Sequence, residues 1–317
     1  MPGEPRSRSR GCRGPRAAGG TGSSRTAGVG DGTRTRKGTA LLNHRRLPLY
    51  TGLLLLVGGI AAGPPRAGGA EPDSTSVVPT EAPAATPTGI APTVYGPGER
   101  MVFEISYGPV TAGEGILETM GTVDHMGRTC YHVQSTANSN RFFSSIYKVR
   151  DKIVTYIDVA DLSSAYFYKR LREGDYKKTL EIEFDREAGL ARYGDGHEMA
   201  VPAGIQDELS AFYYVRNLDL EAGRDLMLPA HTSRRNYNMK VIVHGRETVE
   251  VPAGKFECFV VEPVLEGEGL FKHDGRITLY ISADARRVPV LMKTKVPVGS
   301  IDVALKEYRA GVPLKQR

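Results

Sequence analysis

The sequence predicts a mainly β protein, built on a curved antiparallel sheet that forms a half-barrel or a two-layer sandwich, with one main helix near residues 206–217. Three observations predict it. Apolar and polar side chains alternate in several segments, glycine- and proline-containing turns separate those segments, and helical spacing of apolar residues occurs at one place. Such alternation is typical of antiparallel strands with one buried and one wet face.

The alternation extends from one end of residues 99–317 to the other. About a dozen strands follow from it, and so many antiparallel strands are expected to curl or to split into two layers. The clearest inward-facing sets are Met101, Phe103, Ile105 and Tyr107; Leu180, Ile182 and Phe184; Ile277, Leu279 and Ile281; and Ile301, Val303 and Leu305.

Residues 206–217 break the alternation and predict the main helix. Asp207 and Glu208 would fall in its first turn, where carboxylates meet the positive end of the helix dipole. A shorter helical turn is expected over residues 141–146. We expect the longer helix to lie against the concave face of the sheet. The residues that share its inner face are Leu209, Phe212, Tyr213 and Arg216.

Charge is unevenly distributed along the chain. Of the 42 Lys and Arg residues 12 lie in residues 1–70, against two of the 36 Asp and Glu residues, which leaves 30 basic and 34 acidic side chains in residues 71–317. The positive excess therefore belongs to the N-terminal segment, and the folded part is mildly acidic. This balance indicates no nucleic-acid partner.

Residues 41–70 have the layout of a secretory signal peptide. Positive charge at Arg45 and Arg46 precedes an apolar run over residues 47–62, and small residues follow up to Ala70. We expect cleavage after Ala70 and export to the periplasm or cell envelope. The alternative is a single-span anchor, in which the protein contacts a membrane only because residues 47–62 are retained, although this run is short for a bilayer span.

The remaining segments complete the domain organisation. Residues 1–40 form a basic leader that we expect to be disordered, and a translation start near Leu41 would leave it untranslated. Residues 71–98 are rich in Pro, Thr and Ala and are expected to be a linker. The β-rich domain occupies residues 99–317.

Several short stretches between residues 95 and 310 are distinctive in their order. They are Glu104–Gly108, Ala112–Glu114, Cys130–Val133, Ile146–Asp151, Gln206–Asp207 with Leu209–Tyr214, Val251–Cys258, Glu262–Pro263, Gly269–Phe271, Arg287–Met292 and Gly299–Ile301. Together they resemble the bacterial family called domain of unknown function 3108. The resemblance implies an antiparallel half-barrel or sandwich, and it brings no activity or catalytic residues.

Residue spacings argue against several chemistries. No H-x-x-x-H, H-E-x-x-H or C-x-x-C spacing marks a zinc site, and no G-x-S-x-G turn marks a serine nucleophile. Asp207 and Ser210 stand one helical turn apart, which suits hydrogen bonding at a helix start better than catalysis. We therefore expect no catalytic residue, no metal site and no cofactor.

Adjacent aromatic residues provide the candidate ligand site. Rings at Phe142 and Phe143, or at residues 166–168, cannot all enter one core, so some must meet a second layer, the helix or a ligand. Ordinary packing of two layers accounts for them, and the alternative is an apolar cavity for a lipid or acyl chain. The candidate ligand-binding residues are Phe142, Phe143, Tyr147, Tyr213 and Phe271.

Two cysteines would remain after processing removes Cys12. An oxidising compartment would allow a disulfide between Cys130 and Cys258, and small buried thiols in strands are the alternative.

Three functions are compatible with the sequence. The preferred one is a non-enzymatic envelope protein that binds or carries an apolar ligand such as a lipid, or that supports another envelope protein. The alternatives are an envelope hydrolase whose site is assembled from distant residues, and a membrane-anchored structural protein with residues 71–98 as its stalk.

Overall fold

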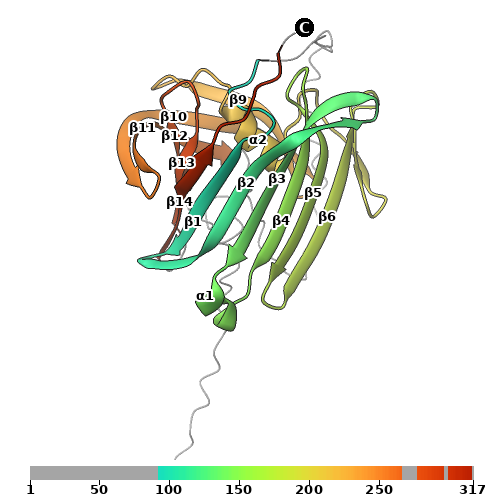
Figure 1. Ribbon diagram of the computed structural model, residues 1–317. Coiled ribbons are helices and arrows are strands. Elements are labelled where there is room, and N and C mark those ends of the chain that lie inside the picture. The colour runs from blue at the N-terminus through green and yellow to red at the C-terminus, as the bar shows by residue number, and fades with distance from the viewer. Residues whose placement is uncertain (1–91, 266–276, 296–298, 316–317) are drawn as a thin grey trace, which may run out of the picture. The chain divides into compact units, whose positions relative to one another are not determined.

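The computed structural model describes residues 92–265, 277–295 and 299–315, all of them within one compact unit. The described residues form fourteen strands in one antiparallel sheet, together with two short helices (Figure 1). The helices are α1 (Arg141–Ile146) and α2 (Glu208–Val215). The strands are β1 (Arg100–Tyr107), β2 (Val110–His125), β3 (Arg128–Ser139), β4 (Arg150–Asp158), β5 (Ser164–Glu173), β6 (Tyr176–Asp185), β7 (Leu190–Tyr193), β8 (Glu198–Ala200), β9 (Asp225–Thr232), β10 (Arg235–Val251), β11 (Gly254–Leu265), β12 (Ile277–Ser282), β13 (Pro289–Lys295) and β14 (Ser300–Arg309).

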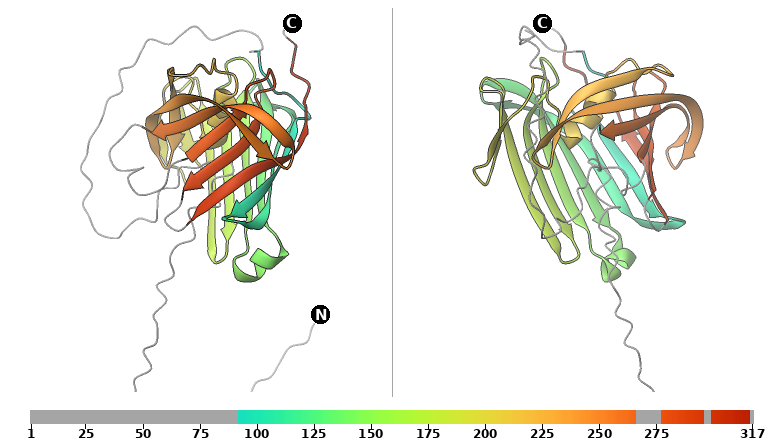
Figure 2. Two further views of the ribbon diagram at one scale, coloured as in Figure 1. Left: turned by 90° about the vertical axis from the view of Figure 1, so that its left-hand side faces the viewer. Right: turned by 180° about the vertical axis from the view of Figure 1, so that it is seen from behind.

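The sheet consists of two antiparallel meanders that pair with each other at the centre of the strand order. The order runs β8-β7-β6-β5-β4-β3-β2-β1-β14-β13-β12-β11-β10-β9, so the pairing of β1 with β14 connects the half made of β1–β8 to the half made of β9–β14. Strands β8 and β9 are left as the two edges. The sheet is strongly curved and does not close into a barrel (Figures 1 and 2). This architecture confirms the mainly β fold class predicted from the alternation.

Irregularities in pairing accompany the curvature. The register shifts between Thr119 and Gly121 in β2 and between Val243 and Gly245 in β10. A β-bulge bends its strand and increases the local twist, and glycine is common at such positions. Strand β10 also contacts β13 and β14, which are not its neighbours in the ladder, so this half of the sheet curls over itself.

The predicted alternation is visible in the register. Val133, Thr155, Phe167 and Ile182 face one another in turn across β3, β4, β5 and β6, and all four are buried. Their chain neighbours point to the opposite face of the sheet. The row therefore belongs to the concave side, which holds the core.

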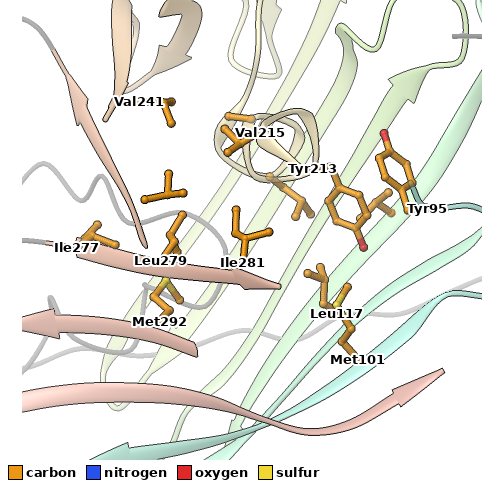
Figure 3. Packing of buried hydrophobic residues seen from close by; sticks show 14 of the residues in the cluster. Tyr95, Met101, Leu117, Tyr213, Val215, Val241, Ile277, Leu279, Ile281 and Met292 are labelled. Atoms are coloured by element: carbon orange, nitrogen blue, oxygen red, sulfur yellow. The ribbon is translucent and has the colours of Figure 1, made fainter. Parts of the chain in front are cut away.

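Helix α2 lies between the two halves of the sheet and contacts β4 and β9 (Figure 2). Tyr213 and Val215 point from it into the core that Leu117 and Ile281 supply from the facing strands (Figure 3). The expectation that the main helix lies on the concave face is therefore confirmed. The segment before α2 is tied to both halves, because Ser164 N donates to Ile205 O (2.9 Å) in one half and His231 N donates to Gln206 O (2.8 Å) in the other.

The two ends of the described chain meet beside this core. Val312 N donates to Pro97 O (3.0 Å), and a Cβ on Gly311 would stand 2.1 Å from Gly96 O, so the two backbones approach more closely than any larger residue allows. Tyr95, inside the range 71–98 predicted as linker, is buried in the core.

A buried ion pair fixes the C-terminal end of α2. Arg216 donates to both carboxylate oxygens of Glu99 (2.7 and 2.8 Å) and through Nε to Arg287 O (2.9 Å), and neither paired side chain is exposed. Burial alone would lower the pKa of Arg216, but the Glu99 carboxylate raises it above its ordinary value. The rings of Tyr95 and Tyr213 lie against the guanidinium.

Residues 1–91 lie outside the described residues, so the predictions of a leader over 1–40 and of a signal or anchor over 41–70 stay predictions. Among the residues that are described, none of the helices has the length and apolar character needed to traverse a bilayer.

Candidate functional site

Three chain connections meet at one end of the half-sheet β1–β8. They are the β1–β2 turn, the β3–β4 connection that contains α1, and the β5–β6 turn (Figure 1). We call residues 107–111, 139–150 and 173–177 the α1 end. Eight large hydrophobic side chains are exposed in the described parts of the chain, and four of them lie here: Val110, Phe142, Ile146 and Tyr176.

Helix α1 is held at its base by polar contacts. Asn140 caps it by accepting from Phe143 N (2.9 Å) and donates through Nδ2 to Thr111 O (2.7 Å), which ties the helix to the start of β2. Ser139 Oγ accepts from Val149 N (2.9 Å) at the other side of the connection. None of the six residues of α1 is buried, so its position depends on these hydrogen bonds and not on an apolar face.

The apolar side chains of α1 consequently project into solvent. Phe142 is 65% exposed and Ile146 is 73% exposed, although both belong to the residue types most often found in cores. The rings of Phe142 and Phe143 contact each other edge to face, with centroids 5.6 Å apart. Contiguous exposed apolar side chains of this kind are typical of an interaction surface.

Tyr147 connects α1 to the β5–β6 turn. A Cβ on Gly174 would lie 2.8 Å from Tyr147 Cε2, and Gly174 has φ of +58°, so both the ring and the turn require glycine here. Gly174 N also donates to Lys148 O (2.8 Å). The ring therefore closes over the end of the sheet, next to the carboxyl group of Glu173.

Two carboxyl groups face each other beneath this ring. Asp151 and Glu173 are both buried on the concave side, and Asp151 accepts from Arg172 N (2.8 Å). Burial and the charge of Asp151 raise the pKa of Glu173 to about 8, and burial also raises the pKa of Asp151. The pair therefore retains a proton at neutral pH, which a hydrogen bond between the two groups shares.

The acid pair supplies two oxygen ligands and no complete metal site. In residues 92–315, leaving aside the gaps at 266–276 and 296–298, no three His, Cys, Asp or Glu side chains are grouped so as to hold a metal ion. Two carboxyl groups that hold one proton between them are able to bind and release that proton without a cofactor.

Lys169 connects this end of the sheet to α2. Its ammonium donates to both oxygens of Glu208 (2.6 and 2.7 Å), and Thr232 Oγ1 donates to the same carboxylate (2.7 Å). Lys169 and Glu208 are almost completely buried. The pair is thus a link between β5, α2 and β9 and is not accessible to a ligand from solvent.

Asp207 and Ser210 form the start of α2. Asp207 accepts from Leu209 N (2.7 Å) and Ser210 N (2.9 Å), while Ser210 Oγ accepts from Asp207 N (2.8 Å), which is a capping box. The hydroxyls of Thr155 and Ser164 donate to the remaining carboxylate oxygen. Burial raises the pKa of Asp207 while the two hydroxyls lower it. The interpretation of this pair as local hydrogen bonding at a helix start is confirmed.

The structure brings together three of the five candidate ligand-binding residues. Phe142 and Phe143 contact each other on α1, Tyr147 is the C-cap residue of the same helix, and Phe142 is the most exposed of the three. Tyr213 lies apart from them, buried on α2 within the core (Figure 3). Phe271 lies outside the described residues.

The two cysteines are free thiols, so the disulfide left open by the sequence is not formed in this structure. Cys130 lies on β3 and Cys258 on β11, with β2, β1, β14, β13 and β12 between them in the sheet. Burial raises the pKa of Cys130 to about 12 and that of Cys258 to about 11, which makes both poor nucleophiles.

Sequence reasoning missed the other members of this end of the sheet. Val110 and Tyr176 flank turns and gave no helical or strand signal of their own. Asp151 and Glu173 could have been found, because each occupies an inward position of an alternating strand where an apolar residue is expected. Their proximity depends on the packing of β4 beside β5, which the sequence does not state.

Comparison with known proteins adds a family. A family model described as "Protein of unknown function (DUF3108)" matches residues 102–306. Among the curated proteins none matches the chain.

Solved structures show distant likenesses. A β-barrel-like protein of the domain of unknown function DUF1849 from Brucella abortus has 9% identity and a TM-score of 0.49, covering 68% of this chain and 98% of its own. A proposed exported protein with a YmcC-like fold from Bacteroides fragilis has 10% identity and a TM-score of 0.31, covering 70% and 99%. A proposed lipoprotein from Parabacteroides distasonis has 10% identity and a TM-score of 0.32, covering 68% and 98%. These likenesses assign no function.

Proposed function

The chain belongs to the DUF3108 family of proteins of unknown function, and from its own residues we propose that it is an exported protein of the bacterial cell envelope that works as a non-catalytic binding module. The proposed contact surface is the α1 end. The observation that carries the proposal is the gathering of Val110, Phe142, Ile146 and Tyr176 on three connections at one end of the sheet.

The export part of the proposal is supported by residues 41–70. The order of positive, apolar and small residues there is typical of a cleaved signal. N-terminal sequencing of the protein from the envelope fraction of the producing cell tests it. A first residue at Glu71 agrees with the proposal. An intact segment 47–62 in the membrane fraction would instead establish an anchor.

The binding part rests on a contrast within the domain. The concave face is occupied by α2 and by the core side chains around it, whereas α1 buries none of its own residues. An apolar partner would therefore gain most of its contact outside the core, at the α1 end. Exposed apolar groups on an otherwise well-packed domain are maintained against their solvation cost, which suggests a partner.

A retention experiment tests this surface. The purified protein is mixed with an envelope fraction from cells that lack it, and the retained fraction is compared between the parent and Phe142→Ser/Ile146→Ser. Each side chain contributes about 1.5–3 kcal/mol when fully removed from water, so we expect retention to fall at least about tenfold. Met227→Ser, which changes an exposed side chain on β9, is the matched control. Equal retention of the parent and the double variant would refute the α1 end as the contact surface.

A further inference from the structure

Basic side chains gather beside the exposed apolar residues of the α1 end. They lie on the α1 connection and on β4, β5 and β6. On β4 and β5 they alternate with buried residues, whereas Lys177 on β6 lies in an exposed run. The folded part as a whole is mildly acidic, so this gathering is local. The basic residues are Arg141, Lys148, Arg150, Lys152, Arg170, Arg172 and Lys177; we call them the basic set.

The basic set includes like charges placed directly opposite each other. Lys152 pairs with Arg170 across β4 and β5, and Arg172 pairs with Lys177 across β5 and β6. Like charges at opposite positions of an antiparallel pair destabilise it. Two such pairs on adjacent ladders therefore lower the stability of the sheet, and they have no role in folding that would explain them.

The segments that carry this set hold few acidic side chains, although Glu181 on β6 lies on the same face, opposite Tyr168. Within residues 139–153 and 169–178 the acidic side chains are Asp151, Glu173 and Asp175, and only Asp175 is exposed. The ion pairs between described residues involve other cations, such as Arg192 with Asp185 on the neighbouring strands. A partner that carries negative charge would offset the repulsion.

The apolar and basic residues are arranged on a projecting end. The apolar side chains come from three connections at the same end of the sheet (Figure 1), and the basic set lies beside two of these connections, on the α1 connection and on β4, β5 and β6. A bilayer surface with anionic lipids is complementary to both kinds of side chain. Its phosphates attract cationic side chains, and the boundary below the headgroups accommodates aromatic and aliphatic side chains.

We infer that the α1 end docks on the surface of a membrane that contains anionic phospholipids. The inference rests on the proposed function, and it names the partner of the same surface. Phe142 and Ile146 enter the headgroup boundary, and the basic set contacts lipid phosphates. From the sequence, membrane contact was expected only through residues 47–62. The α1 end would allow the protein to contact a membrane after a signal peptide has been removed.

Vesicle binding tests the inference directly. The protein purified from the exporting cell is mixed with vesicles of phosphatidylcholine alone or with about 30% phosphatidylglycerol, and the bound fraction is measured after sedimentation. We expect binding to the anionic vesicles to be at least about tenfold stronger, and to fall as NaCl rises from about 0.05 M to about 0.5 M, because salt screens surface charge.

Two variants with a matched control locate the contact. We expect Arg150→Gln/Arg172→Gln/Lys177→Gln to lower binding to anionic vesicles at least about tenfold, and Phe142→Ser/Ile146→Ser to lower it to a similar degree. Arg224→Gln/Arg235→Gln/Lys255→Gln removes the same charge from exposed positions of the other half of the chain and should leave binding almost unchanged.

The outcomes separate this inference from the proposed function. Equal binding to neutral and anionic vesicles, or equal loss in the control variant, would overturn the role of the basic set. Absence of vesicle binding, together with retention by the envelope fraction that Phe142→Ser/Ile146→Ser abolishes, would establish a protein partner and leave the proposed function intact. If Phe142→Ser/Ile146→Ser is retained by that fraction as well as the parent, the proposed function itself fails.

Discussion

The two helices of the structure begin alike and end in opposite environments. Asn140 caps α1 and Asp207 caps α2, each by accepting a hydrogen bond from the backbone of the first turn. None of the residues of α1 is buried, whereas α2 buries Leu209, Ser210, Ala211, Tyr213 and Val215. Local chemistry therefore starts a helix, and the curvature of the sheet decides whether that helix becomes core or surface.

The difference extends to the charges beside each helix. Around α2 the charged side chains are buried in pairs, Arg216 with Glu99 and Lys169 with Glu208. Around α1 the basic set faces outward with like charges opposite each other. The region of α2 thus links the two halves of the sheet, whereas the α1 end has the properties of a contact surface. Substitutions should separate the two.

The largest expected effect comes from Arg216→Met. It leaves the Glu99 carboxylate buried without its partner, and breaking a buried pair in this way costs about 3–5 kcal/mol of unfolding free energy. Urea denaturation measures it. Arg141→Met at α1 is the control and should change stability by less than about 0.5 kcal/mol. A loss of unfolding free energy under about 1 kcal/mol for Arg216→Met would show that the Arg216–Glu99 pair does not hold α2 to the sheet.

A smaller effect is expected from removing the caps. Asp207→Ala deprives two backbone amides and the hydroxyls of Thr155 and Ser164 of their acceptor, at a cost of about 2–4 kcal/mol. Asn140→Ala removes a partly exposed cap and should cost about 1 kcal/mol. Thermal unfolding followed by circular dichroism compares them. Equal destabilisation by the two substitutions would remove the contrast between the helices.

The effect expected from Glu173→Gln differs from the others because it depends on pH and is small below about pH 5. The folded state holds the proton of Glu173 up to about pH 8, whereas the ordinary value of 4.5 applies when the chain unfolds. The parent should therefore lose stability as pH rises from about 4.5 to about 8, since the folded state binds more protons in that window. Glutamine imitates the protonated acid and still donates to Asp151.

Denaturation at pH 5 and pH 8 measures this dependence. We expect parent and variant to be similar at pH 5, and the variant to be more stable by on the order of 2 kcal/mol at pH 8, because one pKa unit corresponds to about 1.4 kcal/mol and Asp151 retains part of the slope. A parallel pH dependence in both proteins would mean that Asp151 and Glu173 do not share a proton.

Much of the fold was predictable because strand periodicity is a local property. Inward positions such as Ile182 and Val303, the helix near 206–217 and the short turn of helix at 141–146 all follow from spacing along a few residues. The contact surface was predictable only in part. Phe142, Phe143 and Tyr147 were selected because adjacent rings cannot share one core. Tyr213, another candidate ligand-binding residue, belongs to the core itself.

The sequence by itself determined which segments are strands, which face of each strand is apolar and where the helices start, because each of these depends on neighbouring residues. The signal segment over residues 41–70 stays a prediction. Tertiary structure alone decided that β1 pairs with β14, that α2 fills the concave face while α1 stays outside, and that basic residues of a mildly acidic domain gather in one place. The physical reason is that register and curvature bring together side chains from distant strands. The composition of the chain gives only an average charge and does not show where the charged side chains gather.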